Sequence, residues 1–278
     1  MIGPLVRLMR LYYSLPFAAG FLVIVAYLRG GQLAAVRSEL LLSFFSLLCV
    51  ISSGYVLNDI RDVRIDRINC PWRVLAAGRI SGKTALLWAS VLLTMGLAAA
   101  WLCNPPFFLG TSAIAAGLVC YDLISKRIGV FKDLFVALLL TALYPLAFTV
   151  AEPIKTPRLN VLFIHPLWLF LSAGGYEMLK DTRDVKGDSQ IRGETLSYSQ
   201  SRTFQITARV LIVAGSLVTL LPFVLGYCHA VYLAASVAAI LLAVSSTFRK
   251  PAAAMRYVYG EIFLITAGSL VDLWVFGA

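Results

Sequence analysis

Three oxygen-bearing side chains follow the second apolar run of the sequence at helical spacing. Asn58, Asp62 and Asp66 are four residues apart, so on one continuous helix they form a single stripe. Like charges at this spacing repel one another unless a cation lies among them. The stripe therefore predicts a cation-binding helix face. Asp59 is adjacent in sequence but points elsewhere on a helix, so we rank it lower.

A second acidic cluster follows the sixth apolar run. Asp181, Asp184 and Asp188 are spaced i, i+3 and i+7, again on one helical face, and Lys180 precedes them. Two carboxylate sets opposed across a cavity suit magnesium–diphosphate chemistry, because Mg²⁺ takes hard oxygen ligands from carboxylates, phosphates and water. Nearby Lys and Arg would neutralise the departing diphosphate. Solvated loops of mixed charge are the alternative, and two clusters at matching positions argue against it.

The elements that position these residues are predicted to be membrane helices. The 278 residues are 60% hydrophobic and 14% charged, against roughly 25% charged in soluble domains. The mean hydropathy is +0.84. Apolar runs of spanning length predict nine helices, at about Tyr13–Leu28, Leu40–Leu57, Ala85–Leu102, Pro106–Tyr121, Leu134–Val150, Val161–Leu179, Val210–Gly226, Ala230–Phe248 and Tyr257–Phe276.

The basic residues separate by side of the membrane. Lys and Arg number 24, Asp and Glu 14, and the formal net charge is +10. These charges occur in bursts between apolar runs, which excludes a nucleic-acid-binding surface. With nine spans, the opposite side holds only Arg29, Arg37, Lys155 and Arg158. By the positive-inside rule the N-terminus and both acidic clusters are cytoplasmic, and the C-terminus is outside.

The two acidic clusters follow equivalent runs, the second and the sixth. This indicates one domain over residues 1–278 with two weak four-helix halves, about 13–121 and 134–248, and a ninth helix. The five cysteines form no CxxC pair and the two histidines are isolated, so neither a zinc site nor a Ser-His-Asp triad has support.

In these motifs the chain resembles the UbiA superfamily of intramembrane prenyltransferases. The family pattern has Asn-x-x-x-Asp-x-x-x-Asp after the second helix, Tyr and Lys after the fourth, and Lys-Asp-x-x-Asp-x-x-Gly-Asp after the sixth. Gly-x-Thr-Leu follows the last motif, and Gly193, Thr195 and Leu196 match it. The three main motifs are met by Asn58, Asp62, Asp66, Tyr121, Lys126, Lys180, Asp181, Asp184, Gly187 and Asp188.

The resemblance implies an all-α integral membrane protein. Nine transmembrane helices would surround a central cavity that opens laterally to lipid, with a cytoplasmic cap from the loops after helices 2 and 6. The implied reaction is magnesium-dependent ionisation of a prenyl diphosphate, followed by attack of an acceptor on the carbocation. The implied metal ligands are Asn58, Asp62, Asp66, Asp181, Asp184 and Asp188. The implied substrate-binding residues are Arg10, Arg73, Lys126, Tyr121 and Lys180, and the catalytic ones are Asp62, Asp66, Asp181, Asp184, Lys126 and Tyr121.

The segment after the first motif narrows the choice of acceptor substrate. It is similar to that of archaeal-type geranylgeranylglyceryl-phosphate geranylgeranyltransferases and chlorophyll synthases, whereas hydroxybenzoate prenyltransferases usually have two more residues before the Arg. Asn69, Pro71 and Arg73 keep the pattern. Its Pro, Pro and Ser are replaced by Val74, Ala76 and Ala77.

We therefore expect transfer of a polyprenyl group, geranylgeranyl by this resemblance, to a lipid acceptor. The acceptor would be geranylgeranylglyceryl phosphate, in ether-lipid synthesis. One alternative in the same family is an aromatic, quinone or tetrapyrrole acceptor, and another is a terpene cyclase that uses the donor alone. A non-enzymatic transporter would have ionisable residues at the middle of its spans, which the predicted spans almost entirely lack.

Overall fold

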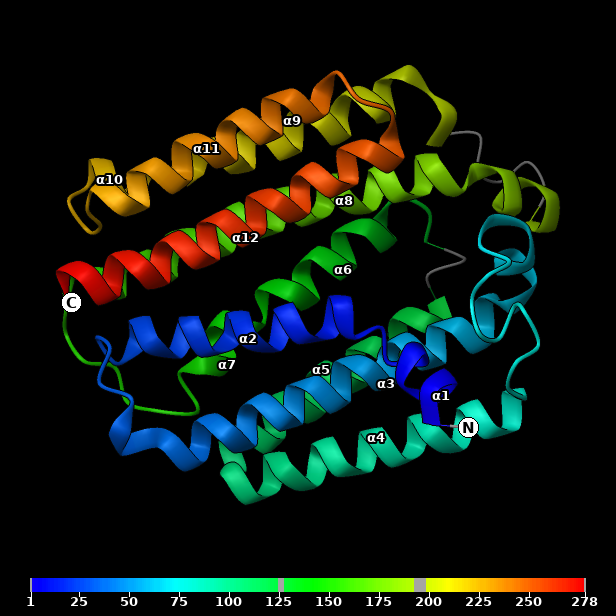
Figure 1. Cartoon of the computed structure of the whole chain (residues 1–278), viewed down its shortest axis with the longest axis horizontal. Coiled ribbons are helices and arrows are strands. Elements are labelled where there is room, and N and C mark those ends of the chain that lie inside the picture. The colour runs from blue at the N-terminus through cyan, green and yellow to red at the C-terminus, as the bar shows by residue number, and fades with distance from the viewer. Residues whose placement is uncertain (1, 125–127, 193–198, 278) are drawn as a thin grey trace.

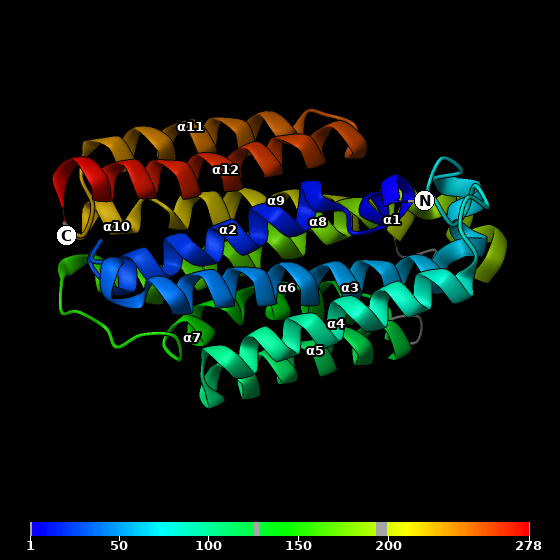
Figure 2. The same cartoon turned by 60° about the horizontal axis from the view of Figure 1, so that its bottom comes forward.

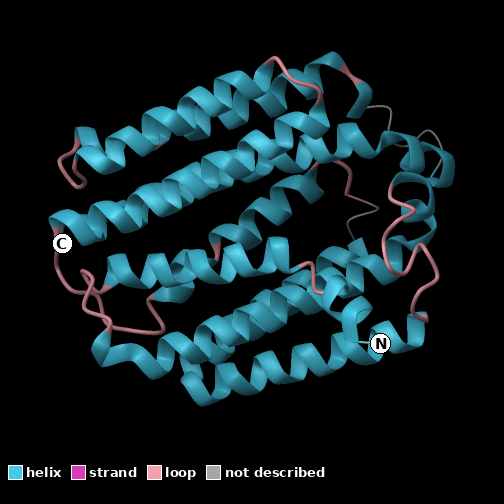
Figure 3. Ribbon diagram, viewed as in Figure 1, coloured by secondary structure: helices cyan, strands magenta, loops and turns pink. Residues whose placement is uncertain are grey.

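The protein is a bundle of long helices (Figures 1 and 3). The computed structural model describes residues 2–124, 128–192 and 199–277, and their side chains except those of residue 2 and residues 186–192. These ranges contain helices, turns and loops but no strand. They are α1 (Ile2–Leu8), α2 (Leu11–Leu28), η1 (Ala34–Val36), α3 (Arg37–Asn69), α4 (Gly82–Cys103), α5 (Pro105–Ile124), α6 (Phe131–Thr141), α7 (Leu143–Ala147), η2 (Pro157–Asn160), α8 (Val161–Arg192), α9 (Arg202–Val218), α10 (Leu221–Val224), α11 (Ala230–Thr247) and α12 (Pro251–Phe276).

Eight segments of the described chain are long and apolar enough to cross a membrane. They contain α2, α3, α4, α5, α8, α9, α11 and α12. Large apolar side chains such as Phe248, Phe263 and Trp274 are exposed on the outside of the bundle, as expected of helices that face lipid. Figure 2 shows α11 and α12 on one side and α4 and α5 on the other, with α2, α3, α6 and α8 between them.

The predicted fifth span, 134–150, is a broken pair of helices. It corresponds to α6 and α7, which meet at Ala142, and neither is of spanning length. Pro145 has no N–H to bond the carbonyl of Thr141, so it interrupts the helical ladder at this point. Of the nine predicted spans, eight are therefore long apolar helices in the described chain, and the fifth is a broken pair of shorter helices.

The acidic motifs lie on extensions of two long helices rather than on loops. Helix α3 continues for 33 residues, past its apolar part to Asn69, and α8 continues for 32 residues to Arg192. Cys70 ends α3 in a non-helical conformation, with φ −142° and ψ 60°, because the following Pro71 disfavours a helical residue before it. Both extensions reach the same end of the bundle, together with α1 and the segment 70–81 (Figure 1).

Small residues let the helices approach closely. A Cβ atom on Gly175 of α8 would lie 2.5 Å from the carbonyl oxygen of Ala208 in α9. A Cβ atom on Gly96 of α4 would lie 2.9 Å from the carbonyl oxygen of Ser46 in α3. Small residues at helix contacts are a common means of packing membrane helices.

A buried ion pair connects helices at the end of the bundle opposite the acidic motifs. Arg158 is 1% exposed and Asp272 is 0% exposed, and Arg158 Nη1 lies 2.6 Å from Asp272 Oδ2. Arg158 also donates through Nε to the carbonyl of Gly277 at 2.6 Å. Asp272 accepts the backbone N–H groups of His229 and Tyr232, each at 3.0 Å. This network joins η2, α11 and the last turn of α12, which carries the C-terminus.

Candidate active site

The two acidic motifs meet at one end of the bundle. The side-chain nitrogen Nδ2 of Asn69, at the end of α3, donates to the carbonyl of Asp184 in α8 at 2.8 Å. This hydrogen bond joins residues 115 positions apart. The structure thus places the ends of the two motif-bearing segments in contact.

Two arginines pair with acidic side chains on the helix that carries the first motif. Asp66 is buried, and its Oδ1 lies 2.5 Å from Arg73 Nη1. Asp59 is also buried; it pairs with Arg10 and lies 3.7 Å from Arg73. Burial lowers the pKa of Arg73, but the hydrogen bond and charge of Asp66 outweigh it and raise that pKa above its ordinary value. The Arg73 guanidinium therefore keeps its positive charge.

Arg10, which pairs with Asp59, lies at a break between two helices. It is the one described non-glycine residue with a positive φ, 46°, and it stands between α1 and α2. Such a conformation costs about 1–3 kcal/mol and persists where surrounding contacts enforce it. The pairing with Asp59 and the stacking of the guanidinium 5.3 Å from the Tyr55 ring provide such contacts. The lower rank given to Asp59 from the sequence is not supported by this geometry.

Basic residues also hold the second motif. Lys132, near the start of α6, lies 2.5 Å from Asp181 Oδ1. Arg183 makes two hydrogen bonds of 2.6 Å to the neighbouring Asp184. Lys180 pairs with Glu177 one turn earlier in α8. The sequence motifs assigned no role at the site to Lys132 or Glu177.

The carboxylates of both motifs suit a magnesium ion. Asp181 Oδ2 is buried and has no hydrogen-bond partner within the described part of the chain. This carboxylate oxygen can therefore act as a hard ligand for a metal ion. In the same described ranges no group of three His, Cys, Asp or Glu converges, because Asp66, Asp181 and Asp184 each face an Arg or Lys instead. One or two carboxylates with phosphate oxygens are enough for Mg²⁺, so the donor set fits.

Two residues of the predicted site lie outside the part of the chain whose side chains the structure describes. Lys126 falls in the segment 125–127, and Asp188 falls among the side chains of 186–192, as does Gly187. The Gly-x-Thr-Leu match at 193–196 is outside as well. Asp62 is half-buried on α3 and has interactions of its own.

Two cavities open beside the motifs. The first, of about 150 Å³, lies among α2, α3, α5, α6 and α8, and it brings together Arg10, Asn58, Tyr121 and Lys180 of the predicted site. Its other walls are mainly Leu and Ile side chains. The second, of about 100 Å³, lies among α2, α3, α6, α8 and α12 and is lined by Arg10, Arg73 and Lys180, again from the predicted site.

A group of tyrosines surrounds the second cavity. The rings of Tyr13 and Tyr259 are stacked with centroids 5.3 Å apart, and those of Tyr13 and Tyr55 are 5.7 Å apart. The hydroxyl of Tyr176 donates to that of Tyr259 at 3.2 Å. Electron-rich ring faces stabilise cations, so this cavity can accommodate positive charge without water.

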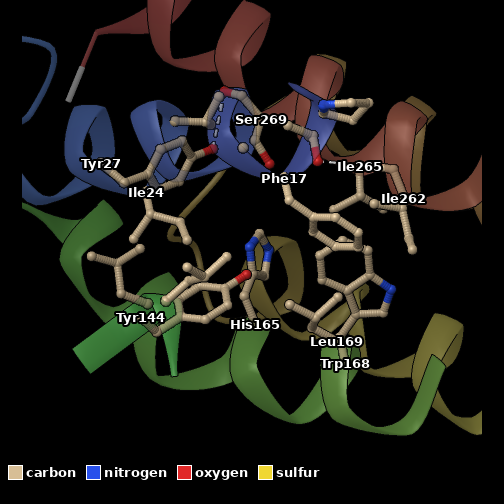
Figure 4. A pocket seen from close by; sticks show the side chains of 16 residues that line it. Phe17, Ile24, Tyr27, Tyr144, His165, Trp168, Leu169, Ile262, Ile265 and Ser269 are labelled. Atoms are coloured by element: carbon tan, nitrogen blue, oxygen red, sulfur yellow. Dashed lines mark hydrogen bonds between the residues drawn. The ribbon is translucent and has the colours of Figure 1, made fainter. Parts of the chain in front are cut away.

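A third, apolar cavity of about 70 Å³ lies deeper in the bundle (Figure 4). Phe17 lines all three cavities, and Ile262 lines the second and the third. Tyr27 donates to the carbonyl of Ser269 at 3.0 Å, and His165 Nε2 lies 2.9 Å from the Tyr232 hydroxyl. The polar atoms at this depth are thus largely paired, and the surface facing the cavity is apolar.

Lys132 provides a test of the charge pairing at the site. Lys132→Met keeps the length of the side chain but leaves the buried Asp181 without its partner. We expect the free energy of unfolding to fall by about 1–3 kcal/mol. Thermal unfolding in detergent with EDTA measures the effect, with Lys155→Met, on an exposed loop at the other end, as the matched control. Equal stability of Lys132→Met and the wild type would contradict the pairing.

Comparison with known proteins identifies relatives along most of the chain. The model of the UbiA prenyltransferase family matches residues 14–256. The chain is 29% identical over 223 residues to the digeranylgeranylglyceryl phosphate synthase of Saccharolobus solfataricus, covering 80% of this chain and 77% of that protein. It is 30% identical over 207 residues to the synthase of Hyperthermus butylicus, covering 72% and 67%.

Solved structures share the fold. A structure of digeranylgeranylglyceryl phosphate synthase matches with a TM-score of 0.72 and 20% identity, covering 98% of both chains. A UbiA homologue from Archaeoglobus fulgidus bound to GPP and Mg²⁺ matches with a TM-score of 0.64 and 17% identity, covering 98% of this chain and 100% of that one.

Proposed function

Because the chain belongs to the UbiA prenyltransferase family, we propose that it transfers a geranylgeranyl group from its diphosphate to the hydroxyl of geranylgeranylglyceryl phosphate. The product would be a lipid with two ether-linked chains. As a family member with eight apolar helices, the protein is a multi-pass integral membrane prenyltransferase. The observation that carries the choice of acceptor is the similarity, near 30% identity over most of the chain, to several synthases of digeranylgeranylglyceryl phosphate.

The shape of the site supports this choice. Two cavities with largely apolar linings adjoin each other, and Arg10 and Lys180 line both of them. Donor and acceptor in this reaction each have one anionic head and one long isoprenoid chain. Two adjoining cavities that share cationic side chains suit two such substrates, whereas a cyclase needs room for one.

The donor head would be held by the acidic motifs through magnesium. When bound, the ion neutralises charge on the departing diphosphate. Its proposed ligands are Asn58, Asp62, Asp66, Asp181, Asp184 and Asp188.

Cationic side chains would complete the binding of phosphate oxygens. Arg73 keeps its charge through Asp66, and Arg10 and Lys180 face both cavities. Tyr121 lines the first cavity, where its hydroxyl can donate to an oxygen of either substrate. Lys126, with the same proposed role, is five residues further along the chain.

The ionised prenyl group would lie among the tyrosines of the second cavity. Cleavage of the bond between C1 and the diphosphate leaves an allylic cation, which the rings of Tyr13, Tyr55, Tyr176 and Tyr259 stabilise. Apolar walls exclude water, so that the acceptor rather than a water molecule captures the cation.

The site would face the cytoplasm. The broken pair α6–α7 would then form the ninth crossing, and the C-terminus would be outside. The distribution of basic residues supports this orientation. The C-terminus indeed lies at the end of the bundle opposite α1 and the acidic motifs (Figure 1).

A competition among acceptors tests the proposal. Purified protein receives geranylgeranyl diphosphate, Mg²⁺ and equal amounts of geranylgeranylglyceryl phosphate, its dephosphorylated alcohol and an aromatic acceptor. We expect the phosphate-bearing lipid to account for most of the product identified by mass spectrometry. Preference for the aromatic acceptor would overturn the proposal, as would a cyclic hydrocarbon formed without any acceptor.

A further inference from the structure

The wall between the first and second cavities contains one acidic group. Both cavities are lined by four polar residues, which are Arg10, Tyr55, Glu177 and Lys180. The remaining shared lining residues of the described chain are apolar. With donor and acceptor in these two cavities, as the proposed function has them, their reacting atoms would meet next to this wall.

Glu177 is held in place by the helix that carries the second acidic motif. It lies on α8, one turn before Lys180, and is 7% exposed. Lys180 donates to its Oε2, and among the described residues Lys180 is its hydrogen-bond partner. The second oxygen, Oε1, is thus left to accept a further hydrogen bond.

We propose that Glu177 accepts the proton of the acceptor hydroxyl during prenyl transfer. This inference rests on the proposed function, because it requires an acceptor that attacks through a hydroxyl group. The bond between C1 of the prenyl group and the bridging oxygen of the diphosphate breaks, and both electrons leave with the diphosphate. The hydroxyl oxygen forms the new bond to C1, and its proton passes to the Glu177 carboxylate. The carboxyl group returns that proton to water before the next turnover.

The other polar groups on the shared wall do not fit this role. Arg10 and Lys180 are cations with no lone pair to accept a proton, and the Tyr55 phenol is a neutral donor at physiological pH. Asp66, Asp181 and Asp184 each pair with an Arg or Lys, and the carboxylates of the two acidic motifs are proposed to hold the donor head. Glu177 is the described anion that faces both cavities and belongs to neither motif.

Glu177→Gln tests the role with little change of shape. We expect formation of the ether to fall by about 100-fold or more, the usual range for loss of a general base. Magnesium-dependent release of diphosphate from the donor alone should stay within about threefold of wild type, because ionisation needs no base. The ratio of ether to prenyl alcohol should therefore fall. Glu177→Asp, which keeps a carboxylate, should recover part of the ether formation.

The matched control is Glu152→Gln, an exposed position in the loop between α7 and η2, which should behave as wild type. Undiminished ether formation by Glu177→Gln would overturn the inference. Equal loss of ether formation and diphosphate release would also overturn it, since Glu177 would then act on the donor. Thermal unfolding of each variant in detergent identifies loss of fold. If the wild type forms no ether with any hydroxyl acceptor, the proposed function fails first, and Glu177 has no such role.

Discussion

Alanine at Asp62 or at Asp184 is expected to lower the release of diphosphate from a prenyl diphosphate by at least about 10³-fold, while the protein remains folded in detergent. Each substitution removes a hard oxygen donor from one of the two helix ends that meet at the Asn69–Asp184 hydrogen bond. The ion that neutralises the leaving group would lose a ligand on that side. Diphosphate release with and without Mg²⁺ measures the effect.

The fold should tolerate both changes. Asp184 is half-exposed and contacts the neighbouring Arg183, and Asp62 is half-buried at the end of α3. Glu152→Ala, far from the motifs, is the control for loss of an acidic side chain. Wild-type rates in either variant, or in wild-type protein with the metal chelated, would exclude the proposed mechanism.

The largest effect on stability is expected at the other end of the bundle. Arg158→Met leaves the fully buried Asp272 without its cation, and the loss of one partner from such a pair costs about 3–5 kcal/mol. The guanidinium also donates to the carbonyls of Asp272 and Gly277, which would lose those donors. Thermal or denaturant unfolding in detergent provides the measurement.

A double-mutant cycle separates the pair from its surroundings. Asp272→Asn should destabilise on its own, and the double variant Arg158→Met/Asp272→Asn should lose less stability than the two single variants added together. Additive losses would show that Arg158 and Asp272 do not stabilise each other. Arg29→Met, whose guanidinium makes one exposed hydrogen bond to the carbonyl of Glu152, should have little effect.

Much of the site could be predicted because its signals are local. Helical spacing alone placed Asn58, Asp62 and Asp66 on one extension and Asp181 and Asp184 on another, and both extensions are helical. The sequence also indicates that Asp59 and Asp66 share a helix face. Asp59 is seven residues before Asp66, and seven residues are close to two turns. Asp59 lies outside the four-residue spacing of Asn58, Asp62 and Asp66, which is why that spacing alone does not indicate it.

Other site features depend on tertiary packing. Lys132 contacts Asp181 across 49 residues, because α6 packs against α8, and no local pattern encodes that contact. The role proposed for Glu177 depends on its position in the lining of both cavities, and no pattern in the sequence encodes that position. The break between α6 and α7 was partly readable from Pro145, although proline is tolerated within membrane helices, as Pro16 in α2 and Pro166 in α8 illustrate.

The mass of the product tests the central claim most directly. Purified protein with geranylgeranyl diphosphate, geranylgeranylglyceryl phosphate and Mg²⁺ should form a lipid heavier than the acceptor by one geranylgeranyl group in place of one hydrogen, with the phosphate retained. No such product should form when the metal is chelated. Failure to form this ether under conditions in which the protein releases diphosphate from the donor would contradict the account.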